Sequence, residues 1–286
     1  MTAYIGKIDL HTHSNASDGA LSPQELVQRA IDRGLTHLAL TDHDCVSGIE
    51  DAIEASLGRI EIISGSEFST TWRSNQIHIV GLFLDIKNPF LNEYLNAQNE
   101  KRIERSISIG NKLDRLGFKD SYKKTCAQAS DGAIITRGNY ARFIVSEGRA
   151  SNTDEAFNVY LKKGKKAYVA TQWPDIKEAV SIIHKANGAA VLAHPGRYEL
   201  TNTKLRELME YFKEVGGDGI EISSSQQSPS ERDYLKNLAL RYDFYGSLGS
   251  DFHSLKPYRD LGLNLKLPAG IKPIWTLDCA SLHNFS

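Results

Sequence analysis

The amino-acid sequence predicts an α/β fold, either a barrel or a sheet of parallel strands, built from strand–helix units. Two observations lead to this prediction. Seven short apolar runs with strand character alternate with amphipathic helical patterns over most of the chain. The alternation stops only between residues 89 and 171, where helical patterns and basic residues replace it.

The first predicted unit lies close to the N-terminus. A strand starting at Ile8 leads into a polar segment that contains His11 and His13. Side chains two positions apart on a strand share a face, so these two imidazoles are expected to point the same way. Ser22 and Pro23 then have the features of a helix N-cap and of a first helical residue. Paired histidines at a strand end are typical of a metal site.

The same pattern recurs along the chain. A helix is expected at about 49–57. In parallel barrels and open sheets, ligands gather at the carboxyl ends of the strands, so we expect the functional residues there. The further predicted strands are 35–40, 60–63, 76–83, 188–194, 219–222 and the start of 245–253.

The segment 89–171 is predicted to be a mainly helical insertion between two parts of the barrel, 1–88 and 172–286. Within it, residues 91–116 have the pattern of one long amphipathic helix and residues 152–161 that of a shorter one. We expect the insertion to cover the mouth of the barrel and to recognise substrate. A solvated surface face is the alternative explanation for its many lysines and arginines.

Composition excludes some classes of protein. Apolar residues make up 41% and charged residues 24%, as in ordinary globular proteins and unlike disordered ones. A net charge of -1 gives no overall attraction for nucleic acid, so an anionic partner needs a local cluster of cations. No run has the length of a membrane span and no signal-peptide pattern is present, so we expect a cytoplasmic protein. We also expect it to be a monomer. Cys45, Cys126 and Cys279 are expected to be reduced thiols.

Nine potential metal ligands lie at or near the ends of predicted strands, and six of them are histidines out of nine in the chain. Imidazole and carboxylate ligands without thiolate suit Zn, Mn or Fe. Their number supports two or three ions with open positions, a type of site that activates water for phosphoester hydrolysis. The candidates are His11, His13, Asp18, His43, Glu67, His78, His194, Asp251 and His253.

The order of these motifs resembles that of the PHP (polymerase and histidinol phosphatase) superfamily over nearly the whole chain. The motifs are Asp9–Ser14 with Asp18 and Gly19, Ala39–Asp44, Gly65–Glu67, His78, Ala193–Gly196 and Gly249–His253. The resemblance implies a distorted seven-stranded βα barrel with a trinuclear metal site, with Mn as the expected metal and Fe or Zn as alternatives.

The insertion resembles the stand-alone bacterial branch of that superfamily, through the segments Ile135–Phe143 and Gly164–Val169. This branch includes a nucleoside 3',5'-bisphosphate phosphatase and a 5'-to-3' exoribonuclease that trims the 5' ends of ribosomal RNA.

The resemblance assigns a role to each candidate ligand. The first metal and its hydroxide nucleophile would be held by His11, His13, Glu67 and Asp251. Glu67 would bridge to a second metal, which would also be held by His78 and His194. The third metal would be held by Asp18, His43 and His253. Asp42 would orient a ligand or cap a helix.

Arginines of the insertion could recognise a second phosphate, because a guanidinium is always charged and binds phosphate with two donors. Arg102 and Arg105 share a helix face, and Arg137 and Arg142 are expected to flank a short polar turn. Surface ion pairs are the alternative role for each arginine. The predicted substrate-binding residues are Arg102, Arg105, Arg137, Asn139, Arg142 and Arg197.

Three functions remain open from the sequence. The first is a phosphoesterase that cuts the 3'-phosphoester of 5'-phosphorylated nucleotides, acting on nucleoside 3',5'-bisphosphates and from the 5' end of short RNA, and releasing nucleoside 5'-monophosphates. The second is a histidinol-phosphatase or another small-molecule phosphomonoesterase, which would not need the arginines. The third is an RNA-binding or polymerase-associated module with a structural metal site, although structural sites are usually fully ligated. The near-neutral charge favours RNA ends over duplex DNA.

Overall fold

A computed structural model describes residues 4–5, 7–256, 258–281, 283 and 285 of the chain. Its centre is a seven-stranded sheet whose strands are adjacent in chain order, from β2 to β8. The sheet curls until its two edges meet, where hydrogen bonds join Leu10 to Leu248 and His13 to Phe252. The predicted barrel of seven strands is therefore confirmed, with the closure made by only a few bonds. The strands are β2 (Ile8–Asp9), β3 (His37–Leu40), β4 (Glu61–Trp72), β5 (Asn75–Leu82), β6 (Ala189–Leu192), β7 (Gly219–Ser223) and β8 (Tyr245–Leu248).

One strand contradicts the prediction of a fully parallel barrel, because β5 is antiparallel to both β4 and β6. The strand predicted at 60–63 continues to Trp72, and Arg73 in the left-handed region (φ 55°) helps to turn the chain straight back into β5. A connection this short forces antiparallel pairing, since a parallel pair needs a crossover of a dozen or more residues. The first half of β5, with His78, therefore lies at the same end as the carboxyl ends of the parallel strands.

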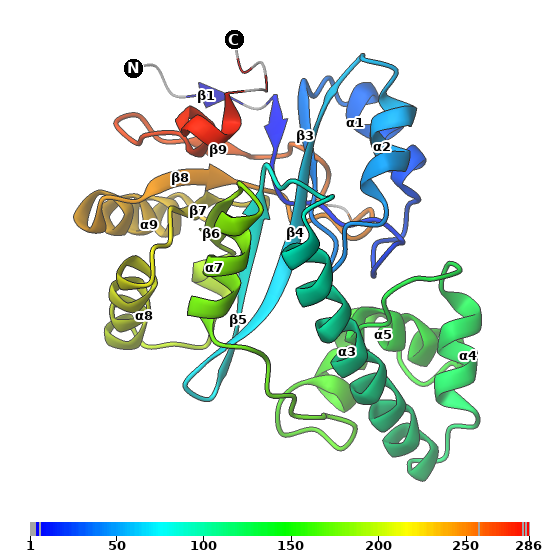
Figure 1. The fold of residues 1–286 in the computed structure, drawn as a ribbon. Helices are drawn as coiled ribbons and strands as arrows, with labels where there is room; N and C mark the ends of the chain where they lie inside the picture. Colours follow the sequence, from blue (N-terminus) through cyan, green and yellow to red (C-terminus); the bar gives the residue numbers. More distant parts are fainter. Residues whose placement is uncertain (1–3, 6, 257, 282, 284, 286) are drawn as a thin grey trace.

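Helices cover the outside of the barrel in two groups, visible in Figure 1 as α1 and α2 beside β3 and as α7, α8 and α9 along the other strands. The predicted helix start at Ser22 and Pro23 is confirmed, because Ser22 and Glu25 form a reciprocal capping box. On α1, Leu26 and Val27 are buried in the same apolar cluster as β3. The helices are α1 (Pro23–Asp32), α2 (Ile49–Ser56), α7 (Ile176–Lys185), α8 (Asn202–Glu214) and α9 (Pro229–Tyr242).

A group of helices between β5 and α7, here called the helical lobe, has its own apolar core, with Phe118, Tyr140 and Phe143 buried in it. Figure 1 shows its helices α3, α4 and α5 projecting to one side of the barrel. The long helix predicted from Leu91 to Leu116 is present as α3. The lobe comprises α3 (Pro89–Arg115), α4 (Ser121–Gln128), α5 (Arg137–Ser146), α6 (Thr153–Ala156) and the π-helix η1 (Phe157–Leu161).

The structure corrects the prediction for two segments of the lobe. The shorter helix predicted at 152–161 is split into α6 and the π-helix η1. Arg137 and Arg142 do not flank a turn, because both lie on α5. This helix begins at a capping box of Thr136 and Asn139, in which Asn139 replaces the more usual Glu or Gln and so weakens the sequence signal.

Three further observations complete the description of the fold. A short antiparallel pair, β1 (Tyr4–Ile5) with β9 (Lys266–Leu267), brings together segments close to the two ends of the chain. The three cysteines are unpaired thiols, as expected. Within the described part of the chain, no helix combines the length and the apolar character needed to span a membrane.

Candidate functional site

The candidate ligand residues lie together at the carboxyl end of the barrel. His11 and His13 follow β2 and His43 follows β3, while Glu67 and His78 lie within the β4–β5 hairpin. Asp18 lies in the loop between β2 and α1, His194 follows β6, and Asp251 and His253 follow β8. The residues form three overlapping groups, in each of which the ligand atoms lie within 4.8 Å of one another. The groups are His11, His13, Glu67 and Asp251; His13, Asp18, His43 and His253; and His43, Glu67 and His78.

The first group has the dimensions of a tetrahedral metal site. The Nε2 atoms of His11 and His13 lie 3.1 Å apart, and each lies 3.3–3.5 Å from Glu67 Oε2 and from Asp251 Oδ1. Ligand atoms about 2.0–2.2 Å from a central ion are spaced about 3.3–3.6 Å apart in a tetrahedron. The spacing of these four atoms therefore fits a divalent ion among them.

Glu67 lies between the groups and uses both of its oxygens. Its Oε2 atom lies 3.0 Å from His43 Nδ1, in addition to its contacts in the first group. Its Oε1 atom lies 2.7 Å from His78 Nδ1 and 2.9 Å from His194 Nε2. This position lets one carboxylate contact two neighbouring ions.

Asp18 anchors the remaining group and connects it to the helical lobe. Its Oδ1 atom lies 3.3 Å from His253 Nε2 and 3.9 Å from His43 Nε2. Its Oδ2 atom accepts a hydrogen bond from the Thr136 hydroxyl at the start of α5. The structure also places His13 in this group, in addition to the residues that the resemblance implies.

The carboxylates of the site are ionised. Burial would raise the pKa of Glu67, but His78, His43 and His11 outweigh it and hold this pKa well below its usual value. Burial is likewise outweighed at Asp18 by His253 and His43, so the pKa of Asp18 is also well below its usual value. Ionised carboxylates are the form that binds a metal.

The histidines divide into two classes. Burial lowers the pKa of His43 to about 4 and also lowers that of His78, which keeps both imidazoles neutral at pH 7. At His13, burial is outweighed by Asp251 and Glu67, which raise its pKa to about 10. Burial is also outweighed at His11 by Glu221 and Glu67, so its pKa lies well above the usual value. Without metal, the neighbouring carboxylates therefore favour protonation at the His11–His13 pair.

Unsatisfied polar atoms are a second sign that the site is built for ions. Five of its buried side-chain atoms have no hydrogen-bond partner in the described structure, and buried polar groups are rarely left so. They are His13 Nδ1, Asp18 Oδ1, His43 Nδ1, Glu67 Oε2 and His194 Nδ1. An ion would satisfy Asp18 Oδ1, His43 Nδ1 and Glu67 Oε2, whereas His13 and His194 face the other candidate ligands with Nε2.

Glu221 on β7 is a functional residue that sequence reasoning missed. Its Oε1 atom lies 2.6 Å from His11 Nδ1, and its Oε2 atom accepts a 2.6 Å hydrogen bond from the backbone N–H of His194. Its side chain is buried. An acid between Ile220 and Ile222 in a buried strand was the available signal, since such a position is normally apolar.

Two further acids hold the loops that carry the ligands. Asp42, expected to orient a ligand or cap a helix, accepts hydrogen bonds from Ser14 and Ser17 and so fixes the loop after His13. Asp9 accepts a 2.8 Å hydrogen bond from the backbone N–H of Ser250 and thus holds the loop that leads to Asp251. Asp251 itself has a φ of 52°, a strained conformation of the kind that clusters at active sites.

Three arginines face the candidate ligands across a cavity of about 190 Å³. The guanidinium of Arg102 donates to Asp44 at 2.7 Å and to Ser69 at 2.7 Å, so it already has an anionic partner. The Nε atom of Arg105 is buried without any hydrogen-bond partner among the described residues. Burial lowers the pKa of Arg105 to about 9, and repulsion from Arg137 and Arg102 adds to this effect. A bound anion would relieve this unbalanced positive charge.

The other predicted substrate-binding residues have partners within the protein. Arg142 donates to the backbone carbonyl of Asp18 at 2.7 Å. Asn139 is used in the capping box of α5 and donates to the carbonyl of Ser17 at 3.3 Å. Arg197 forms an ion pair with Asp251. The contacts of all three residues thus stabilise loops that carry candidate ligands.

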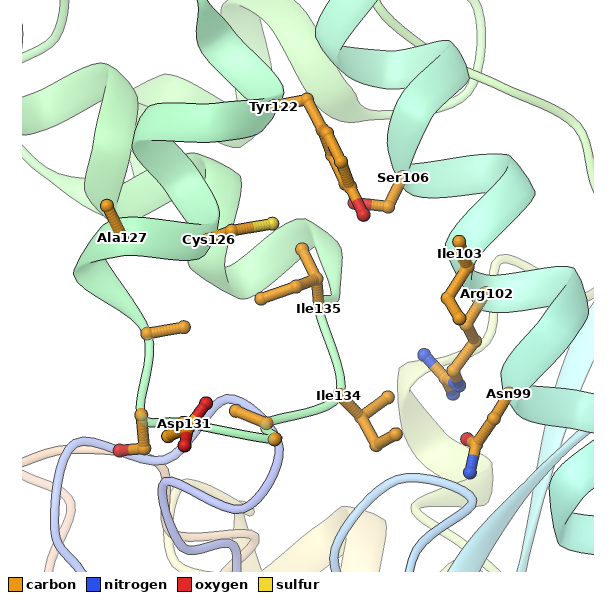
Figure 2. A pocket seen from close by; sticks show the side chains of 14 residues that line it. Asn99, Arg102, Ile103, Ser106, Tyr122, Cys126, Ala127, Asp131, Ile134 and Ile135 are labelled. Carbon is orange, nitrogen blue, oxygen red and sulfur yellow. The ribbon is translucent and has the colours of Figure 1, made fainter.

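A larger cavity of about 510 Å³ lies inside the helical lobe, between α3, α4 and the segment before α5. Figure 2 shows Arg102 and Asn99 on one side of it, Tyr122 and Ser106 at one end, and Cys126, Ala127 and Asp131 on the other side. Arg102 lines this cavity as well as the cavity beside the candidate ligands. The two cavities therefore adjoin. The larger one, inside the helical lobe, has the mixed apolar and polar lining of a small-molecule site.

Comparison with known proteins gives consistent matches over nearly the full chain. Residues 9–225 match the family described as PHP domain. A protein of Escherichia coli (strain K12) named 5'-3' exoribonuclease Rnm is 42% identical over 96% of this chain and 95% of its own length. The 3',5'-nucleoside bisphosphate phosphatase of Chromobacterium violaceum is 38% identical over 95% of this chain and 96% of its own. A solved structure of an amidohydrolase from Chromobacterium violaceum, described with bound sulfate and no metal, has a TM-score of 0.89 at 38% identity and covers 94% of both chains.

Proposed function

Since this chain belongs to the PHP domain family, we propose that it is a metal-dependent phosphoesterase that hydrolyses the 3'-phosphoester of 5'-phosphorylated nucleotides. It would act on nucleoside 3',5'-bisphosphates and from the 5' end of RNA oligonucleotides, releasing nucleoside 5'-monophosphates. The relatives named for these two activities support the proposal. The observation that carries it is the arrangement of three arginines, of which Arg105 and Arg137 have no ion-pair partner among the described residues, opposite the candidate metal ligands in one cavity.

The candidate ligands fit two or three divalent ions, and we propose three, with Mn as the metal. The ligand set of imidazoles and carboxylates suits Mn, Fe or Zn, and the buried unsatisfied atoms support the presence of ions. Bound ions would supply Lewis acidity at the phosphoryl group and lower the pKa of a bound water. The ligands would be His11, His13, Asp18, His43, Glu67, His78, His194, Asp251 and His253.

The arginines would recognise the 5'-phosphate and so fix which ester bond is cut. Arg105 and Arg137 have spare donors, whereas Arg102 is held by Asp44 and contributes its charge. Trp173 supports this cluster, with the guanidinium carbons of Arg102 and Arg105 lying 5.1 and 5.5 Å from its ring centre. A substrate with phosphates at both ends of one nucleoside would satisfy both sides of the cavity. Its nucleoside would face the larger cavity that Arg102 also lines.

The deciding experiment compares substrates and variants. Mn-reconstituted protein should hydrolyse adenosine 3',5'-bisphosphate and release 5'-AMP, and should release 5'-mononucleotides from a 5'-phosphorylated RNA. Arg105→Gln should lower kcat/KM on the bisphosphate about tenfold to hundredfold, the value of a hydrogen bond to a charged group. The same variant should leave kcat/KM on adenosine 3'-monophosphate, which lacks the 5'-phosphate, nearly unchanged.

The control is Arg115→Gln, which removes an exposed arginine from the same helix and should behave like the wild type on both substrates. Asp251→Asn should abolish hydrolysis without changing the circular dichroism spectrum. A protein that hydrolyses histidinol phosphate faster than the bisphosphate, with no effect of Arg105→Gln, would contradict the proposed substrate. Substrates of this class belong to the cytoplasm, where we expect the protein to act.

A further inference from the structure

A basic groove lies beside the cavity of the candidate ligands. It has a volume of about 380 Å³ and lies between the β4–β5 turn, the segment after η1 and the segment after His194. We propose that this groove holds the RNA chain on the 3' side of the phosphate that is cut. The proposal rests on the proposed function and adds the surface that would allow RNA to be a substrate. The residues that carry the argument are Gln76, Arg137, Lys162, Lys163, Lys165 and Tyr168.

The groove is continuous with the cavity of the candidate ligands. Gln76 and Arg137 line both spaces, and the Nη2 atom of Arg137 lies 3.5 Å from Gln76 Oε1. The cavity itself measures about 190 Å³, less than the roughly 300–1,000 Å³ of typical small-molecule sites. The second nucleotide of an RNA substrate therefore has to lie outside this cavity. Gln76 and Arg137 line both spaces, so the RNA chain would pass them and continue into the groove.

The charge of the groove matches a phosphodiester chain. Five cationic side chains line it and Glu199 is its one acid among the described lining residues. The lysines at 162, 163 and 165 are exposed. Among the described lysines, the ones that form ion pairs are Lys124, Lys256 and Lys272, so the groove lysines remain available for phosphates. On a chain with a net charge of -1, this concentration of positive charge is local.

The groove lysines are presented by an ordered segment. Backbone hydrogen bonds connect Lys165 to Lys162, Tyr168 to Lys165 and Ala167 to Tyr160. Lys112 of α3 also donates to the carbonyl of Tyr168 at 2.5 Å. Tyr168, carried on this ordered backbone, gives the groove an aromatic side chain, and base stacking on an aromatic ring tolerates any sequence.

The π-helix η1 connects the groove to the reaction centre. Its first residue, Phe157, lines the cavity of the candidate ligands, and Lys162 follows its last residue. π-Helical turns are rare and occur frequently at functional sites. One short element therefore contributes both to the cavity for the first nucleotide and to the groove for those that follow.

The test uses a variant with Lys162→Gln, Lys163→Gln and Lys165→Gln. We expect kcat/KM on adenosine 3',5'-bisphosphate to change less than twofold, since that substrate ends at the cavity. On a 5'-phosphorylated RNA of ten nucleotides, KM should rise at least tenfold. The wild type should favour longer RNA, from two nucleotides upward, and the variant should lose this preference.

Binding gives a readout that does not depend on metal or turnover. In EDTA, fluorescence anisotropy with the same labelled RNA should show at least tenfold weaker binding by the variant. The slope of log K against log salt concentration should fall by about two, since each phosphate contact contributes about 0.7 for single strands. The control variant, Lys87→Gln with Lys119→Gln and Lys123→Gln, makes the same charge change at exposed positions outside the groove and should match the wild type. Melting curves establish that both variants are folded.

The possible failures are distinguishable. If the wild type cleaves the bisphosphate and the RNA but the groove variant handles every length of RNA normally, the groove proposal is wrong and the proposed function stands. If the groove variant loses the bisphosphate and the RNA equally, the groove belongs to the first nucleotide and the proposal is also wrong. If the wild type cleaves neither substrate, the proposed function fails, and normal RNA binding by the groove variant in EDTA would then overturn the groove assignment too.

Discussion

Glu221 contacts two of the proposed ligand residues at once and belongs to neither the metal ligands nor the arginines. One of its oxygens orients the His11 ring through Nδ1, and the other holds the backbone of His194. His194 has a φ of 32°, so its backbone needs such an external contact to stay in place. Glu221 is therefore positioned to orient residues that we propose hold the first and second ions.

Replacement by glutamine tests this role. In Glu221→Gln, one of the two contacts would place the amide N–H₂ against another donor, so either the His11 ring or the His194 backbone has to shift. We expect Mn affinity to fall about tenfold to hundredfold, as is typical when a residue that orients a metal ligand is changed. At saturating Mn, kcat should recover to within a few-fold of the wild type. Titration calorimetry and the dependence of kcat on Mn concentration measure the two effects.

Glu61→Gln is the matched control, because Glu61 lies 2.7 Å from His283 Nδ1 in an acid–histidine pair away from the site. It should leave Mn affinity unchanged. Equal Mn affinity for Glu221→Gln and the wild type would show that Glu221 serves only the fold.

The residues of the site differ in how far the sequence could predict them. The candidate ligands were predictable because His, Asp and Glu are uncommon at strand ends and six histidines gathered there. Glu221 was marked only as an acid in a buried strand, and its role was not predictable, because its partner His11 is 210 positions away and no local pattern connects them. The hydrogen bonds of Asn139 and Arg142 to the loop of Asp18 could not be predicted either. They depend on how the helical lobe packs against that loop.

At the scale of elements, the start of α5 sets the position of Asp18. A Cβ atom at Gly138 would lie 2.5 Å from Asp18 Oδ2 and 3.0 Å from Asp18 Cβ. Contacts below 3.0 Å require a shift, and here the group that shifts is a proposed metal ligand. The φ of Gly138 is not in the left-handed region, so the backbone conformation alone does not require glycine. Glycine is needed because the helix backbone lies so close to Asp18.

We predict that Gly138→Ala separates stability from metal binding. Alanine favours a helix over glycine by about 1 kcal/mol, which offsets part of the cost of moving Asp18, so the metal-free melting temperature should change little. Metal content should fall by one ion per chain relative to the wild type, and kcat/KM should drop at least tenfold. Elemental analysis and assays on the bisphosphate measure both.

Gly196→Ala serves as the comparison, because the nearest atom to its added Cβ, Leu235 Cδ1, is 4.0 Å away although the residue lies close to His194. It should keep the full metal content. Full metal content in Gly138→Ala as well would mean that Asp18 adapts or is not a ligand.

The elements were largely predictable, with an informative exception. Helix starts such as Ser22–Pro23 and the periodicity of α3 are local signals and proved correct. The predicted parallel direction of β5 was wrong. The hairpin turn at Arg73 and Ser74 lacks the Asn-Gly or Asp-Gly pair that usually marks a two-residue hairpin turn. Closure of the barrel depends on hydrogen bonds between residues 10–13 and 248–252. These residues are far apart in the sequence, so no local pattern can show that they pair.

At the scale of the whole molecule, metal binding and folding stability are expected to be linked through protons. In the metal-free protein, neighbouring carboxylates favour protonation of the His11–His13 pair, because they raise both pKa values against the effect of burial, that of His13 to about 10. A histidine with a raised pKa stabilises the folded state fully below its unfolded pKa of about 6.5, and this contribution is lost as the pH rises through the folded value. A metal ion has to displace these protons, so its apparent affinity rises with pH over the same range.

We therefore predict that the difference in Tm between Mn-loaded and EDTA-treated protein widens from pH 7.5 to pH 8.5. The stability gained from Mn is the metal-binding free energy, which rises by on the order of 1 kcal/mol per pH unit for each proton that the metal displaces. His43 adds little to the slope, because burial lowers its pKa to about 4 and it is neutral in both the folded and the unfolded state over this range. Differential scanning calorimetry in matched buffers measures the difference.

The double variant His11→Gln with His13→Gln should show a small difference in Tm that does not change with pH. A gap that stays constant in the wild type would mean that the two histidines are already neutral without metal, and the charge balance of the empty site would then have to come from other groups.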